Sequence, residues 1–162
     1  MAKKEKEMKT NVMRLLDQSG IPYNYYCYIN TSAISGVEVA NAMNQPLEKV
    51  FKTLVTVAAS KQHYVFLIPV AEELNLKKAA AAVSEKSIEM LKQKDLLPLT
   101  GYIHGGCSPI GMKKTFRTVF HKSILELDTI IFSAGKLGYQ VEVSPDSLKN
   151  IITYDVADII VG

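Results

Sequence analysis

The amino-acid sequence predicts one domain of the α+β class, residues 1–162, with helices packed around a mixed β-sheet. Its 162 residues are 48% hydrophobic and 22% charged, which is typical of a single globular domain with its own core. Segments that predict strands are interspersed with helical patterns, and the sequence shows neither an internal repeat nor a regular βαβ alternation. This order favours a mixed sheet with helices around it.

Segments rich in β-branched and aromatic residues predict the strands. They cover residues 23–28, 50–59, 63–70, 117–121, 129–135, 139–144 and, as a short last strand, 158–161. A short polar link separates the second segment from the third, and this spacing predicts an antiparallel hairpin. We expect the hairpin to form the centre of the sheet.

Apolar residues at helical spacing, together with start and stop signals, predict the helices. They cover residues 4–19, 37–43, 76–83, 87–91 and a segment that begins at residue 145. Gly20 ends the first helix, Asn75 is placed to cap the third, and Pro98 is expected to stop the fourth. Ser144 precedes Pro145 as the cap of the last helix.

The charge balance excludes a protein that coats nucleic acid. The net charge is +3 at pH 7 and the isoelectric point is about 8.7, far from the dense Lys and Arg content of duplex-binding proteins. We therefore expect no DNA partner and only local contacts with any RNA. No apolar run approaches the roughly 18 residues of a membrane-spanning helix. The charged N-terminus also lacks a signal-peptide core, so we expect a soluble, cytoplasmic protein without a membrane partner.

The sequence predicts neither a metal site nor a nucleotide cofactor. His63, His104 and His121 are far apart in the sequence, and such spacing does not suit a zinc site. Cys27 and Cys107 likewise have no partner at ligand spacing. The glycine-rich stretch lacks the Lys-Ser/Thr pair of a Walker-type phosphate loop.

The stretch GYIHGGCSPIGMKK, residues 101–114, combines four glycines with a histidine, a cysteine and a serine. Cys107 or Ser108 could act as a nucleophile with His104 as its base, although no carboxylate that would orient the base is evident. Alternatively, the glycines could bring backbone N–H groups close to a carbonyl or an oxyanion. A third interpretation, which composition alone favours, is a tight connection that needs glycine only for positive φ.

Lys52 is unusual because it lies inside an apolar strand pattern, next to Phe51 and near Leu54. Its side chain could face solvent from an outward position of the strand. It could instead face a pocket, where the ammonium would suit a phosphate or a carboxylate. Beside a loop of glycine amides, the second arrangement would form a site for an anionic ester.

Four blocks of the sequence carry a resemblance to a known family. They are VFKTL at 50–54, LNLKKAA at 74–80, TGYIHGGCSPIGMKK at 100–114 and IFSAGKLGYQVEV at 131–143. Together they resemble the YbaK/EbsC family of free-standing aminoacyl-tRNA deacylases, relatives of the editing domain of bacterial prolyl-tRNA synthetase. The resemblance implies a mixed, strongly curved sheet surrounded by helices. It also implies hydrolytic removal of a wrong amino acid from tRNA, classically cysteine from tRNA(Pro) and also from tRNA(Cys).

The same resemblance implies which residues form the site. Lys52 matches the family's signature lysine, which is expected to hold the phosphate or ribose end of the terminal adenosine. Gly105 and Gly106 match paired glycines whose backbone meets the aminoacyl group, and we take these three residues as catalytic. The residues expected to bind substrate are Tyr28, Ser35, Ser108, Pro109, Ser133, Gly135, Lys136 and Gln140. Cys107 occupies a variable position of the motif and is interpreted as a small buried hydrophobe.

Two positions depart from the family and leave the amino-acid preference open. Ser35 stands where many members have an aromatic residue, and Gln140 stands where some members have an acid. One alternative is therefore a deacylase of Ala-tRNA(Pro) that uses an activated water. Another is a non-catalytic adaptor that binds tRNA or a synthetase.

The resemblance further implies a mechanism and partners. In cysteine-specific members the thiol of the substrate attacks its own ester, so no protein nucleophile is required. Proofreading is needed because a proline-sized pocket rejects cysteine only weakly. The expected partners are the aminoacylated acceptor end of tRNA and, transiently, prolyl-tRNA synthetase.

Overall fold

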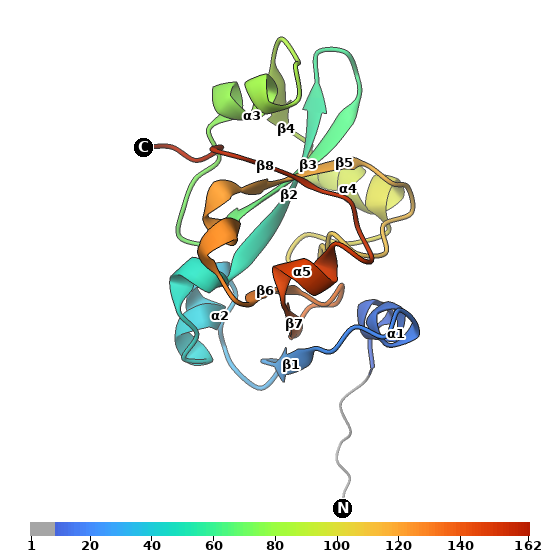
Figure 1. Ribbon diagram of the computed structural model, residues 1–162, viewed down its shortest axis with the longest axis vertical. Coiled ribbons are helices and arrows are strands. Elements are labelled where there is room, and N and C mark those ends of the chain that lie inside the picture. The colour runs from blue at the N-terminus through green and yellow to red at the C-terminus, as the bar shows by residue number, and fades with distance from the viewer. Residues whose placement is uncertain (1–8) are drawn as a thin grey trace, which may run out of the picture.

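Two β-sheets form the framework of residues 9–162, the part of the chain that the computed structural model describes (Figure 1). The larger sheet has the strand order β4-β2-β3-β5-β8, and the smaller has the order β1-β7-β6. The strands are β1 Asn24–Cys27, β2 Phe51–Ala58, β3 His63–Pro69, β4 Ile88–Met90, β5 Arg117–His121, β6 Ile130–Ser133, β7 Tyr139–Val143 and β8 Asp155–Ala157. The larger sheet is mixed, because β2 pairs antiparallel with β3 and β4 whereas β5 is parallel to β3 and β8. The α+β class with a mixed sheet is confirmed, and the strands form two sheets rather than one.

The central hairpin is confirmed, with β2 paired to β3 from Phe51 opposite Pro69 to Val57 opposite His63. Side chains alternate between the two faces of a strand, so β2 contributes to two hydrophobic cores. Phe51 and Val55 pack into the core that includes α1 and the smaller sheet. Ala58 belongs to the core under α3 on the other face.

Five α-helices lie around these sheets within residues 9–162: α1 Asn11–Gln18, α2 Gly36–Ala42, α3 Leu76–Ala82, α4 Gln93–Thr100 and α5 Pro145–Leu148. In Figure 1, α3 and β4 lie at one end of the molecule, whereas α1, α2 and β1 lie at the other. The predicted caps are confirmed, because Asn75 accepts a hydrogen bond from the Lys78 N–H and Ser144 accepts one from the Ser147 N–H. Residues 4–8 of the predicted first helix lie outside the described residues. No helix of the described part is long and apolar enough to span a membrane.

Three predictions about the helices and strands are wrong. Residues 87–91 do not form a helix, because Ile88–Met90 pairs with the end of β2 as β4. Pro98 does not stop a helix but lies inside α4, which ends at Gly101 with a positive φ of 86°. The last strand is Asp155–Ala157 and not residues 158–161, since Val156 is the residue opposite Phe120 of β5. Short apolar runs do not separate strand from helix by periodicity, and here pairing with neighbouring strands decides the outcome.

A half-buried ionic cluster ties the smaller sheet to the loop before β2. The carboxylate of Glu142 accepts hydrogen bonds from the Tyr26 and Thr129 hydroxyls and from Lys49 Nζ at 2.8 Å. Burial alone would raise the pKa of Glu142, but the hydrogen bonds it accepts outweigh burial and lower that pKa. The hydrogen bond from the Tyr26 hydroxyl to Glu142, together with burial, raises the pKa of Tyr26 to about 12. This cluster joins β1, β6 and β7 to the short 3-10 helix Leu47–Lys49.

Candidate functional site

A cavity of about 500 Å³ lies along β2, at the junction of the two sheets. It is lined by Val50, Phe51, Lys52, Thr53, Leu54 and Val55 from β2 and the residue before it, and by residues of β6, β7, β4, α2, α4 and the glycine-rich loop. The described residues that line it include one lysine, one histidine and one cysteine, but no Asp or Glu. The wall of the cavity is therefore mostly apolar, and Lys52 is the single lysine or arginine among its described lining residues.

The cavity occupies a gap beside β2 that no strand fills. At one end of the gap, Val50 bridges Ile131, where the smaller sheet begins. At the other end, β4 pairs only with Thr56–Ala58, and the Leu91 N–H donates to the Val55 carbonyl over 3.1 Å. The edge of β2 between these two points faces the cavity.

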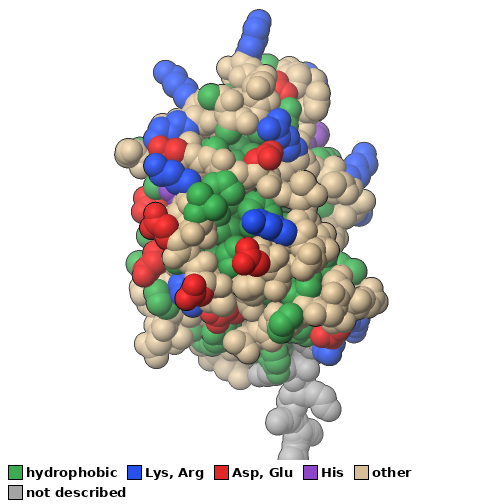
Figure 2. All heavy atoms as spheres, viewed as in Figure 1, with side chains coloured by type: hydrophobic (Ala, Val, Ile, Leu, Met, Phe, Trp, Pro, Cys, Tyr) green, Lys and Arg blue, Asp and Glu red, His purple; other side chains and the backbone are tan. Residues whose placement is uncertain are grey.

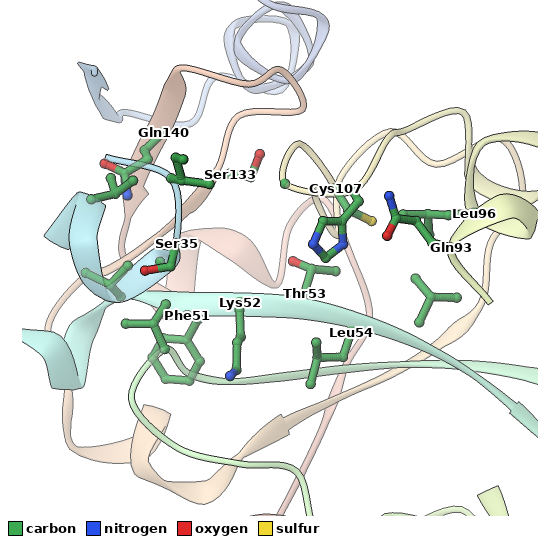
Figure 3. A pocket seen from close by; sticks show the side chains of 18 of the residues that line it. Ser35, Phe51, Lys52, Thr53, Leu54, Gln93, Leu96, Cys107, Ser133 and Gln140 are labelled. Carbon is green, nitrogen blue, oxygen red and sulfur yellow. The ribbon is translucent and has the colours of Figure 1, made fainter. Parts of the chain in front are cut away.

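Lys52 lines the cavity as a half-buried side chain. It forms no ion pair with any carboxylate of residues 9–162. In Figure 3 the side chains of Lys52 and Thr53 leave β2 on opposite sides, and Thr53 is the one on the side of Cys107. The ammonium is thus placed to bind an anion at the border of the cavity and not to transfer protons beside Cys107.

The paired glycines have different environments. Gly105 has a positive φ of 87° and lines the cavity. The N–H of Gly106 donates to the Ile103 carbonyl at 3.0 Å, and a Cβ on Gly106 would lie 3.2 Å from the Leu137 backbone nitrogen. Gly106 is therefore a packing glycine whose donor is already used. Within the described chain, the N–H groups of Gly105 and Cys107 have no acceptor, and both residues line the cavity.

Cys107 is 8% exposed and belongs to the main hydrophobic core. Burial raises the pKa of the Cys107 thiol to about 12. A nucleophilic cysteine needs the opposite, because the thiolate is the reactive form. His104 also lines the cavity, but no hydrogen bond joins its imidazole to Cys107 or to any other described residue.

Four of the polar side chains that line the cavity lie in or next to β1, α2, β6 and β7: Tyr28, Ser35, Ser133 and Gln140. Ser35 caps α2 in a capping box with Glu38, and the Ser133 hydroxyl accepts from the Gly135 N–H at 3.1 Å. Gln140 is 5% exposed, and its Oε1 accepts from Gln45 Nε2 at 2.8 Å. These contacts hold the side chains of Ser35, Ser133 and Gln140 in place.

Four other predicted substrate-binding residues do not line the cavity. Ser108 is fully buried, and its hydroxyl accepts from the Ile110 N–H, with Pro109 in the same turn. Gly135 has a positive φ of 85°, and a Cβ there would lie 2.9 Å from the Tyr102 ring. The Lys136 ammonium lies over the Tyr139 ring, 5.9 Å from its centroid. These contacts give Ser108, Gly135 and Lys136 a structural role in the fold outside the cavity.

Several lining residues were not predicted from the sequence: Thr53, Met90, Leu91, Gln93 and Leu96. All but Thr53 belong to the segment that contains β4 and the start of α4, where the predicted helix was wrong. Among residues 9–162, no group of His, Cys, Asp or Glu side chains is arranged to hold a metal ion.

The fold and the cavity define a class of protein. Residues 31–151 match the model of the aminoacyl-tRNA editing domain family. Two crystal structures share the fold. One, described as a trans-editing enzyme for prolyl-tRNA synthetase, has a TM-score of 0.79 and 22% identity over 93% of this chain and 95% of its own. The other, the hypothetical protein APE2540, has a TM-score of 0.83 and 19% identity over 93% and 99%.

A closer likeness is found in sequence. EbsC of Enterococcus faecalis, whose assigned name is that of a Cys-tRNA(Pro)/Cys-tRNA(Cys) deacylase, is 42% identical over 160 residues, 98% of each chain. The chain belongs to the aminoacyl-tRNA editing domain family.

Proposed function

We propose that this protein is a trans-editing deacylase that releases cysteine from mischarged tRNA(Pro), and also acts on Cys-tRNA(Cys). The observation that carries the proposal is a cavity whose lining residues, within positions 9–162, supply a lysine and two unpaired backbone N–H groups but no carboxylate and no activated nucleophile. Such a wall binds and orients an ester whose own side chain performs the attack. The name of the relative EbsC supports the same substrate.

In the proposed mechanism the thiol of the bound cysteinyl group is the nucleophile. Its sulfur bonds to the ester carbonyl carbon, the bond from that carbon to the ribose oxygen breaks, and the ribose oxygen takes the thiol proton. The product is a thiolactone, which water then opens to free cysteine. The protein contributes near-attack geometry and hydrogen bonds to the developing oxyanion. We assign that donor role to the N–H groups of Gly105 and Cys107, because the Gly106 N–H is already bonded.

The side chain of Lys52 supplies the anchor at the other end of the substrate. An ammonium attracts phosphate as a point charge without demanding a fixed orientation. We therefore assign Lys52 to the phosphate or ribose of the terminal adenosine. Contacts with the body of the tRNA are expected to be few, since Lys and Arg on the face in Figure 2 are scattered among Asp and Glu. A transient complex with prolyl-tRNA synthetase and a cytoplasmic location stay predictions.

The function is tested by measuring release of radiolabelled amino acid from Cys-tRNA(Pro) and from Ala-tRNA(Pro). Rapid loss of cysteine alone supports the thiol-assisted deacylase. Loss of alanine, which has no thiol, would require an activated water and would refute the mechanism. Binding of tRNA without release of either amino acid would place the protein among non-catalytic adaptors.

Cys107→Ala is expected to keep deacylation of Cys-tRNA(Pro) within about threefold of wild type. The substituted thiol is protonated and buried, and the backbone N–H remains. Because alanine is smaller, some stability is lost, about 1 kcal/mol. Initial rates at matched folded concentration, with His104→Ala measured beside it, check the expectation. A folded Cys107→Ala protein without activity would identify the thiol as catalytic and contradict the proposal.

A further inference from the structure

Thr53 occupies the middle of the open edge of β2. It lines the cavity between the bridge at Val50 and the strand pairing that begins at Thr56. In Figure 3 its side chain lies on the same side of β2 as Cys107 and Ser133. None of the four sequence blocks singled it out as a site residue.

The backbone of Thr53 has hydrogen-bonding groups at this edge. In an antiparallel pair, residues bond alternately to the two neighbouring strands. Val50 accepts from the Val70 N–H and Ala58 donates to the Gln62 carbonyl, so the even-numbered residues of β2 bond toward β3. The odd-numbered residues face the other edge, as the Leu91 N–H to Val55 carbonyl bond shows. The N–H and C=O of Thr53 therefore point toward the gap that no strand fills.

The hydroxyl of Thr53 is also without a partner. Its Oγ1 is buried and forms no hydrogen bond within residues 9–162. Thr56, on the opposite face of the same strand, shows the usual solution, since its buried hydroxyl donates to the Tyr64 carbonyl at 2.9 Å. Buried polar groups are hydrogen-bonded with few exceptions, and an exception in a cavity wall points to a ligand.

We propose that Thr53 is a substrate-binding residue that hydrogen-bonds the hydroxyl and ester oxygens of the aminoacylated ribose. The inference rests on the proposed function and deepens it. A rotation of about 120° about χ1 moves the hydroxyl to the position now held by the methyl group, and the methyl group to the position of the Cβ hydrogen. Thr53 then binds the ribose at the open edge of β2, through its backbone groups and its hydroxyl.

The test compares Thr53→Val, Thr53→Ser and the matched control Thr56→Val. Each valine variant removes one hydroxyl from β2 and keeps the shape of the side chain. Steady-state kinetics on Cys-tRNA(Pro) and thermal unfolding without substrate are measured for all three and for wild type. Thr53→Val is expected to lower kcat/KM about 10-fold or more and to leave Tm unchanged or higher. Thr53→Ser stays within about threefold of wild type because it keeps the hydroxyl.

The control is expected to show the reverse pattern. Thr56→Val leaves kcat/KM unchanged but lowers Tm by about 3 °C or more, because it removes the buried hydrogen bond from the Thr56 hydroxyl to the Tyr64 carbonyl. Full activity of Thr53→Val beside an active wild type would overturn the inference and leave the proposed function intact. A Tm loss in Thr53→Val equal to that of Thr56→Val would also overturn it, since the hydroxyl would then have a protein partner. A wild type inactive on aminoacyl-tRNA would overturn the proposed function and this inference together.

Discussion

Lys52→Ala is expected to reduce kcat/KM for deacylation of Cys-tRNA(Pro) by about 100-fold, equivalent to about 3 kcal/mol of transition-state binding. Among the described residues that line the cavity, Lys52 is the only lysine and there is no arginine, so no neighbouring lysine or arginine replaces it. Without an ion pair inside the described chain, its ammonium is available to the substrate. Release of labelled cysteine from Cys-tRNA(Pro), measured over a range of tRNA concentrations, gives the loss directly.

Two further variants distinguish loss of the anchor from loss of the fold. Lys77→Ala removes an exposed lysine from α3, away from the cavity, and is expected to have wild-type kinetics and stability. Lys52→Arg keeps the charge with a larger, planar head group, so partial activity is expected. Equal activity of Lys52→Ala and Lys77→Ala would remove Lys52 from the proposed mechanism.

The sequence predicted those helices and strands whose formation depends on residues close together in the chain. The β2–β3 hairpin follows from two β-branched runs and a short link, and the caps at Asn75 and Ser144 follow from side chains that bond the backbone three residues on. β4 could not be predicted in this way. Its three residues form a strand only because they pair with Thr56–Ala58, far away in the sequence.

In the candidate site, too, the sequence predicted some residues, whereas others depend on contacts between distant segments. Lys52, Gly105, Ser133 and Gln140 come from distant segments, and the structure brings them to one cavity. The motif around them also contains Gly135, whose missing side chain makes room for the Tyr102 ring. A sequence pattern does not separate a glycine needed for packing from one needed for substrate. Thr53 carried no signal either, because its unpaired hydroxyl depends on a gap between strands that only the assembled sheets create.

Glu142→Ala is expected to be the most destabilising of the substitutions considered, at about 2–4 kcal/mol. The carboxylate is the common acceptor for Tyr26, Thr129 and Lys49, and its side chain is 11% exposed. Removing it leaves a half-buried ammonium and two hydroxyls without their partner. Urea unfolding at pH 7 measures the loss, and Glu126→Ala, which removes an exposed carboxylate, is the control, expected within about 0.5 kcal/mol of wild type.

The pH dependence of the Glu142 contribution follows from its lowered pKa. Because the folded protein holds this carboxylate ionised more strongly than the unfolded chain does, its stabilisation is complete above the unfolded pKa of about 4.3. It is lost as the pH falls through the lower folded pKa. The free-energy gap between wild type and Glu142→Gln should therefore be constant from pH 7 to about pH 5 and shrink below about pH 4. A gap that stayed constant down to pH 3 would mean that the hydrogen bonds of this cluster do not depend on the charge of Glu142.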